Sequence, residues 1–248
     1  MSIRLVGFDA DDTLWKSEDY YRDAQARFEA MLARYVDLDD VHERLYAVEK
    51  RNIALFGYGV KGMALSMLEA AHEISGGRVS AGDLHRIVLL AKELLRHPVE
   101  LIPGIREAVA DIAADFPVVL VTKGDLFHQE AKVRDSGLAD AFGRIEIVSE
   151  KDEATYARLF REFEVEPGEF LMVGNSLRSD IEPVLALGGW GVHMPYHVTW
   201  AHEQEVGGMP DEVRAARMRE VASASELPAA VRALAASAQS SFTSPNAR

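Results

Sequence analysis

The sequence predicts an α/β protein in which a parallel-sheet core carries an inserted all-α domain. Three observations lead to this expectation. The chain opens with a short apolar run, Ile3 to Phe8, that ends at an acidic cluster. Residues 17–97 then show the spacing of amphipathic helices and no visible strand. After Pro103 and Gly104, helical segments alternate with apolar runs of strand length.

Length and composition exclude several classes of protein. The chain has 248 residues, of which 48% are hydrophobic and 27% are charged, a globular balance that suits one large or two modest domains. Its net charge of −13 argues against a nucleic-acid partner, which requires a basic face. The absence of cysteine excludes a disulfide framework, a thiolate metal site and a cysteine nucleophile. No apolar run is long enough for a signal peptide or a membrane span, so we expect a cytoplasmic protein without a membrane partner.

The first two elements are a strand and a helical insertion. Ile3 to Phe8 is short and apolar, which predicts a buried strand. Across residues 17–97, apolar side chains recur at helical spacing, with Gly57 and Gly59 as breaks and Pro98 after the last helix. We therefore expect an all-α cap domain over residues 17–97. The apolar positions of its first two helices are Tyr21, Phe28, Met31, Leu32, Tyr35, Val41, Leu45, Val48 and Leu55.

Residues 98–236 are expected to complete the core together with residues 1–16. Helices are expected at 105–116, 125–137, 152–163, 179–187 and 227–236, and strands at 117–122, 144–149, 169–174 and 191–194. This alternation predicts a Rossmann-like parallel sheet, which the N-terminal strand joins because it cannot be buried alone. Residues 237–248 are rich in Ser, Ala, Asn and Pro, and we expect them to form a disordered tail.

Polar residues follow each of the first four expected strands. Open parallel sheets bind ligands at the carboxyl ends of their strands, so we expect these side chains to converge on one site. Carboxylates, a hydroxyl, a lysine and glycine-loop amides would then meet at one edge of the sheet, which is the main evidence for a functional site there. In strand order the residues are Asp9 and Asp11, then Thr122, Lys123 and Gly124, then Lys151, and finally Asn175 with Asp180.

These segments resemble the haloacid dehalogenase-like hydrolase superfamily. The resemblance extends over almost the whole chain up to Asp180 and includes all four of the motifs of that superfamily, in order. It implies a Rossmann-like core with an α-helical cap inserted between the first and second motifs. The matching residues are Asp9-Ala10-Asp11-Asp12-Thr13, Thr122 after a hydrophobic strand, Lys151, and Gly174-Asn175 with Asp180.

The resemblance also implies catalytic and substrate-binding roles. It makes Asp9 the nucleophile that attacks phosphorus and forms an aspartyl-phosphate. Asp11, two residues on in an extended segment, would protonate the leaving oxygen and then activate the water. The Thr122 hydroxyl and the amides of Lys123 and Gly124 would bind the phosphate. The expected activity is hydrolysis of a small phosphomonoester, that is, a phosphatase.

A magnesium ion follows from the resemblance and from charge. Two carboxylates about 4 Å apart at an effective dielectric near 20 repel by about 4 kcal/mol, which a hard divalent cation converts into attraction. By resemblance, Asp9 and Asp180 supply carboxylate ligands and Asp11 a main-chain carbonyl. Lys151 would balance charge on the nucleophile and the phosphoryl group. Mg²⁺ is the expected ion, because oxygen ligands with retained waters suit it.

Several alternatives stay open on the sequence alone. A dehalogenase or a phosphomutase on the same scaffold is possible, as is a catalytically silent module that binds a phosphate ligand. Asp11 favours phosphate-ester hydrolysis, since expulsion of a halide needs no proton. Asn175 stands where many relatives carry Asp, and Lys123 where Asn is common; the Lys123 ammonium either lies beside the phosphate or points into solvent. The expected partner is a small phosphorylated metabolite (a nucleotide, flavin mononucleotide or sugar phosphate), and the chain is expected to be a monomer or homodimer.

Overall fold

The computed structural model describes residues 2–37, 39–198, 200–204 and 208–240. It divides into two compact units. The core unit contains residues 2–16 and 99–123 and the described part of 132–248, and the helical unit contains residues 17–98 and 124–131. Residues 124–131, which the sequence analysis placed in the core, therefore cluster with the helical unit.

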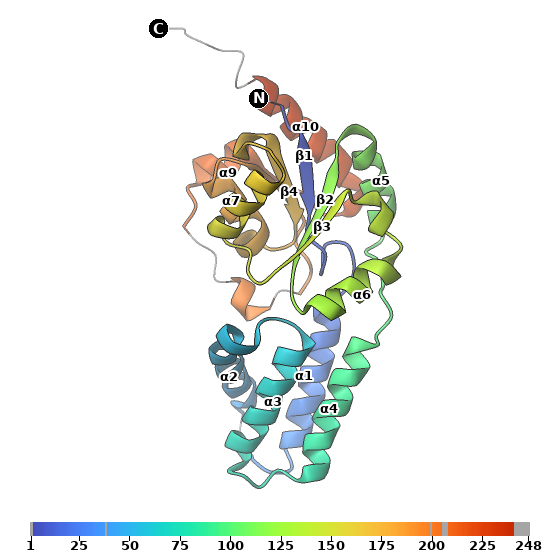
Figure 1. The fold of residues 1–248 in the computed structure, drawn as a ribbon. Coiled ribbons are helices and arrows are strands. Elements are labelled where there is room, and N and C mark those ends of the chain that lie inside the picture. The colour runs from blue at the N-terminus through green and yellow to red at the C-terminus, as the bar shows by residue number, and fades with distance from the viewer. Residues whose placement is uncertain (1, 38, 199, 205–207, 241–248) are drawn as a thin grey trace. The chain divides into compact units, whose positions relative to one another are not determined.

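The core unit is built on a parallel sheet, as the sequence predicts (Figure 1). Its strands are β1 (Leu5–Phe8), β2 (Val118–Lys123), β3 (Arg144–Val148), β4 (Phe170–Gly174), β5 (Trp190–His193) and β6 (Met218–Glu220), in the order β3-β2-β1-β4-β5-β6. Every pairing is parallel, and Phe8 lies opposite both Leu120 and Val173. Strand order reverses at β1, so the switch point where such sheets bind ligands lies at the end of this strand.

The two faces of the sheet are covered by different helices. Successive side chains of a strand point to opposite faces. On one face Val6 and Phe8 pack in a cluster with α5 (Ile105–Asp115) and α10 (Leu227–Ser240). On the other face Leu5 packs in a cluster with α7 (Glu153–Glu162) and α8 (Glu182–Ala186). Each fully buried Phe or Leu side chain stabilises the fold by about 1.5–3 kcal/mol, so the carboxyl end of β1 is held rigidly.

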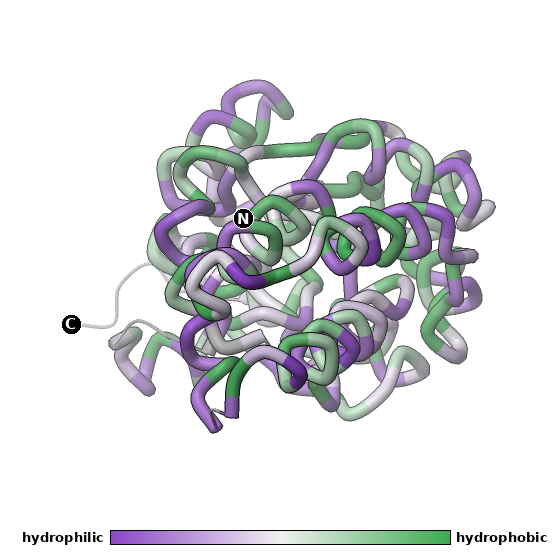
Figure 2. Tube along the Cα trace, turned by 90° about the horizontal axis from the view of Figure 1, so that it is seen from below, coloured by the Kyte–Doolittle hydropathy of each residue, from purple (hydrophilic) through white to green (hydrophobic). Residues whose placement is uncertain are grey.

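Hydrophobic and hydrophilic residues alternate along the coils of the chain in Figure 2, as helices with one buried face require. Shorter helices connect the elements described above. The remaining helical segments of the core are η1 (Ala139–Ala141), η2 (Pro167–Glu169), η3 (Leu177–Ile181), η4 (Ala201–Gln204), α9 (Asp211–Arg217) and η5 (Ala224–Glu226), and α6 (Leu126–Ser136) spans the division between the units.

The helical unit contains α1 (Glu18–Leu32), α2 (Val41–Phe56), α3 (Val60–Ser75) and α4 (Ala81–Leu95). Phe28, Leu45 and Ile87 are buried in its own hydrophobic cluster. Ser80 caps α4 by accepting a hydrogen bond from the main-chain N–H of Asp83. No strand occurs among the described residues of this unit, in line with the expected all-α insertion.

The C-terminal helix is longer than the sequence indicated. The expected disordered tail began at residue 237, but α10 extends to Ser240. Ala238 is buried against the core cluster, and alanine and serine continue the helix without a breaker, which explains the correction. Residues 241–248 of the expected tail lie outside the described residues. Within the described part of the chain, no helix is both long and apolar enough to cross a membrane.

Candidate active site

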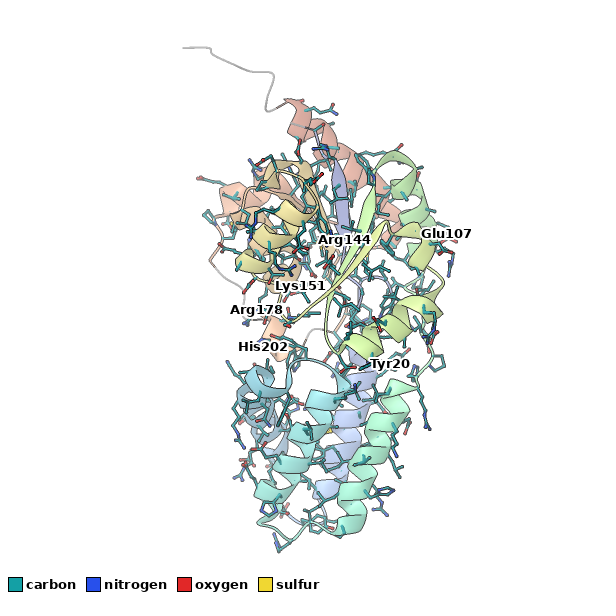
Figure 3. The ribbon with its side chains drawn as sticks, viewed as in Figure 1. Tyr20, Glu107, Arg144, Lys151, Arg178 and His202 are labelled. Atoms are coloured by element: carbon teal, nitrogen blue, oxygen red, sulfur yellow. The ribbon has the colours of Figure 1, made fainter. Side chains whose placement is uncertain are left out.

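The candidate residues of the core unit lie where the strands of the sheet end. Asp9 follows β1, Thr122 and Lys123 end β2, and Asn175 follows β4. Lys151 lies in the loop after β3, at the same edge of the sheet as Arg178 and His202 in Figure 3. These residues therefore lie at one edge of the sheet, where the sequence predicted them.

Lys151 joins two aspartates at the centre of the site. Its ammonium donates to Asp9 Oδ1 and, at 2.7 Å, to Asp180 Oδ1. All three side chains are buried: relative exposures are 6% for Asp9, 3% for Lys151 and 1% for Asp180. Burial alone would lower the pKa of Lys151, but the charges of Asp180 and Asp9 outweigh it and hold that pKa above its usual range.

The surroundings of Asp9 disfavour the ionised form of its carboxyl group. Burial, and then the charge of Asp180, raise its pKa to about 7 although Lys151 opposes the shift. Thr13 donates to Asp9 Oδ2 at 2.8 Å and accepts from the main-chain N–H of Asn175 at 3.0 Å. These contacts fix the rotamer of Asp9. Because its pKa is about 7, full ionisation of the Asp9 carboxyl group at neutral pH requires further positive charge nearby.

Two of the implied metal ligands share a hydrogen-bond donor, the Asn175 side chain. In the amide orientation that satisfies the network, Asn175 Nδ2 donates to Asp9 Oδ2 at 3.2 Å and to the main-chain oxygen of Asp11 at 3.1 Å. The Asn175 amide nitrogen therefore lies within hydrogen-bonding distance of both oxygens and holds them near each other. An aspartate in place of Asn175 could not donate these bonds.

The residues present fit a divalent cation. Asp9 and Asp180 are two buried carboxylates that share a single ammonium, and cations of this kind prefer carboxylate and carbonyl oxygens. No group of three or more His, Asp or Glu side chains among the described residues is placed to hold a metal ion. The implied set has only two carboxylate side chains, and its third ligand is a main-chain oxygen.

The loop after β4 is shaped to position Asp180. The main-chain N–H of Ser176 donates to Asp180 Oδ2 at 3.0 Å. A Cβ atom at Gly174 would lie 2.3 Å from the same oxygen, so only glycine fits there. The helix expected from residue 179 begins instead as a π-helical turn, Leu177–Ile181. Such turns are rare and frequently occur at functional sites.

The ammonium of Lys123 is held by protein groups. It donates to Ser179 Oγ at 2.8 Å and to Glu203 Oε1 at 2.6 Å, and its side chain is only 16% exposed. The sequence left open whether the Lys123 ammonium lies beside the phosphate or points into solvent. Its contacts show that it does not point into solvent. Thr122, one residue earlier, is buried at the end of β2.

Glu203 was not found by the sequence analysis. It lies in η4, and it also accepts a hydrogen bond from Ser179 Oγ at 2.7 Å. Burial alone would raise the pKa of Glu203, but Lys123 and the serine hydroxyls bring it down to about 2. No motif marks this residue, because it reaches the site from a short 3-10 helix far along the chain.

Asp11 contacts two further residues that the sequence analysis did not assign. Its Oδ1 accepts a hydrogen bond from Trp15 Nε1 at 2.6 Å and one from Lys132 Nζ at 2.5 Å. Gly124, by contrast, clusters with the helical unit rather than with the other candidate residues. Its φ of +142° and a would-be Cβ contact of 2.8 Å with Gln129 require glycine.

Comparison with known proteins finds one matching family and several similar structures. The model of the haloacid dehalogenase-like hydrolase family matches residues 3–188. A haloacid dehalogenase-like family hydrolase from Xanthomonas campestris is 56% identical, with a TM-score of 0.86 over 97% of this chain and 95% of that chain. No match was found among curated proteins.

Two more distant structures share the fold. The 2-haloacid dehalogenase from Pseudomonas syringae pv. Tomato DC3000 is 22% identical, with a TM-score of 0.60 over 93% of this chain and 98% of that chain. YfnB from Bacillus subtilis, described as a HAD-hydrolase and bound to magnesium, is 17% identical, with a TM-score of 0.62 over 94% and 99%. At these identities the likeness concerns the fold alone.

Proposed function

Because the chain belongs to the haloacid dehalogenase-like hydrolase family and is thus a hydrolase, we propose that it is a magnesium-dependent phosphatase. The substrate is a small phosphomonoester, such as a nucleotide, flavin mononucleotide or sugar phosphate. The single observation that carries the proposal is the buried contact of Asp9 with Lys151, which also holds Asp180, with Asp11 two residues after Asp9.

The reaction takes two steps at Asp9. In the first, a carboxylate oxygen of Asp9 attacks phosphorus while the bond between phosphorus and the leaving oxygen breaks, and Asp11 gives that oxygen a proton. In the second, Asp11 removes a proton from water, which attacks the aspartyl-phosphate and releases phosphate and free Asp9. Lys151 donates to Asp9 throughout and lies where negative charge gathers in the transition state.

The remaining residues bind and orient. Asp9, Asp180 and the main-chain carbonyl of Asp11 would hold Mg²⁺, which when bound would offset the charge of the carboxylates and the phosphoryl group. The Thr122 hydroxyl and the Lys123 amide would hydrogen-bond the phosphate oxygens. Thr13 fixes the orientation of Asp9 for attack.

Asp11 favours ester hydrolysis over dehalogenation. A halide leaves as a stable anion, so a dehalogenase has no use for an acid at this position, whereas an alkoxide leaving group has to be protonated. The carboxylate of Asp11 is also held by two donors, which a residue without a function in the reaction would not require.

The direct test is release of phosphate from p-nitrophenyl phosphate with Mg²⁺, EDTA serving as the metal-free control. We expect activity that EDTA abolishes and Mg²⁺ restores, and no detectable activity in Asp9→Asn. Chloride release from 2-chloropropionate would instead indicate a dehalogenase, and isomerisation of a sugar phosphate a phosphomutase. Tight binding of phosphate without turnover would indicate a silent binding module.

A further inference from the structure

We propose that Lys132, together with Trp15, is a positioning residue that fixes the Asp11 carboxylate for proton transfer. The inference rests on the proposed phosphatase function and extends it. The Lys132 ammonium lies 2.5 Å and the Trp15 indole nitrogen 2.6 Å from the same atom, Asp11 Oδ1. The Asp11 side chain is 28% exposed, so it can reach a substrate while one edge remains bound.

Trp15 is a fixed donor because its surroundings are rigid. Its side chain is buried, and its backbone forms bridges to Asp11 and to Leu101. The main-chain N–H of Asp12 donates to the oxygen of Trp15 at 2.7 Å, which closes the turn, and Asp12 itself has a left-handed φ of 63°. Asp11 is thus confined between the strand that ends before it and a closed turn.

Lys132 brings a buried cation to the same oxygen. It lies in α6, on the side of the helix that also buries Val133 and Ser136. An apolar side chain would be expected at such a position, because burying an ammonium carries a desolvation penalty that an ion pair only partly offsets. A pair whose cation is buried in this way serves geometry better than stability, and the geometry here is that of Asp11.

Two donors restrain the carboxylate that we assign to proton exchange. Both bind Oδ1 of Asp11, which fixes the rotation of the carboxylate toward the leaving group and water. Without Lys132 the carboxylate would sample other rotamers, and small displacements of an acid or base reduce catalysis steeply.

The test is a leaving-group comparison on the full chain with Mg²⁺. An alkyl phosphate such as glycerol phosphate needs a proton on its leaving oxygen, whereas p-nitrophenolate leaves readily without one. We expect Lys132→Met to lower kcat/KM for the alkyl ester by about tenfold or more, a part of the 10²–10⁴-fold that proton transfer supplies. The loss for p-nitrophenyl phosphate should be less than about threefold. Lys132→Arg, which keeps a cationic donor, should recover part of the activity toward the alkyl ester.

A double-mutant cycle with Asp11→Asn separates positioning from structure. If Lys132 acts through Asp11, Lys132→Met should cause no further loss in the Asp11→Asn background. The exposed Lys92→Met is the matched control, and thermal melting checks folding. Should Lys132→Met fail to fold, Trp15→Phe, which removes the other donor, should show the same selective loss.

Equal losses for both esters, no loss for either, or a full further loss in the Asp11→Asn background would each overturn the role of Lys132. A wild-type enzyme that hydrolyses neither ester would instead contradict the phosphatase function on which this inference rests.

Discussion

At the scale of single residues, the site combines two buried aspartates with one buried lysine. The sequence predicted that Asp9, Lys151 and Asp180 would meet, and their contacts show that they do. It could not predict Lys132 or Glu203, because neither belongs to a local pattern. Both reach the site through tertiary packing, Lys132 from α6 and Glu203 from the short 3-10 helix η4.

Asp9 should make the stability of the metal-free protein depend on pH. Its folded-state pKa is raised to about 7, so the folded chain retains a proton that the unfolded chain loses near pH 4. The stabilisation from this proton is present below about pH 4 and is lost as pH rises through about 7. Urea denaturation in EDTA should show this loss in the wild type, and Asp9→Asn should lack it. An identical pH dependence in both proteins would refute this expectation.

Glu203 should stabilise the site in the opposite pH range. Because its pKa is lowered to about 2, its contribution is present above about pH 4.5 and is lost as pH falls toward 2. Glu203→Gln leaves the buried Lys123 ammonium without its carboxylate, and we expect a loss of about 1–3 kcal/mol at pH 7. The difference from wild type should shrink between pH 4.5 and 3. The exposed Glu93→Gln is the control, and a loss independent of pH would contradict the ion-pair explanation.

At the scale of elements, strands and the helical insertion could be predicted because their apolar periodicity is local. The π-helical turn at Leu177–Ile181 could not, since it depends on how Asp180 packs against Gly174 and Ser176. Strand β6 (Met218–Glu220) is short and only partly buried, so it lacks the apolar run that marks the other strands. The order of the elements along the chain predicted that residues 124–131 belong to the core. Their contacts group them with the helical unit instead.

Gly174 tests how the loop after β4 positions Asp180. Gly174→Ala would place a Cβ atom 2.3 Å from Asp180 Oδ2, so the carboxylate has to move. We expect weaker Mg²⁺ affinity, seen by calorimetry, together with a fall in phosphatase activity. The control is Gly82→Ala in α4, where the nearest atom would be 3.7 Å away. That variant should keep wild-type activity and gain up to about 1 kcal/mol. Unchanged Mg²⁺ affinity in Gly174→Ala would rule out this role.

At the scale of the whole molecule, the acidic chain concentrates its functional cations in one place. Although the net charge is −13, Lys123, Lys132 and Lys151 all lie near the carboxyl edge of the sheet, each paired with a carboxylate. Local positive charge of this kind suits the small phosphorylated substrate that we propose, whereas an extended polyanion would need a broad basic face. The parallel sheet explains why residues that follow different strands lie at the same edge.

The most direct measurement is mass spectrometry of the enzyme after acid quench during turnover of a phosphomonoester with Mg²⁺. Asp11→Asn should be used as well as the wild type, since it lacks the base that removes the intermediate. We expect one phosphoryl group on the peptide that contains Asp9, transient in the wild type and accumulated in Asp11→Asn. Turnover with no covalent phosphate at Asp9 in either protein would contradict an aspartyl-phosphate mechanism at this site.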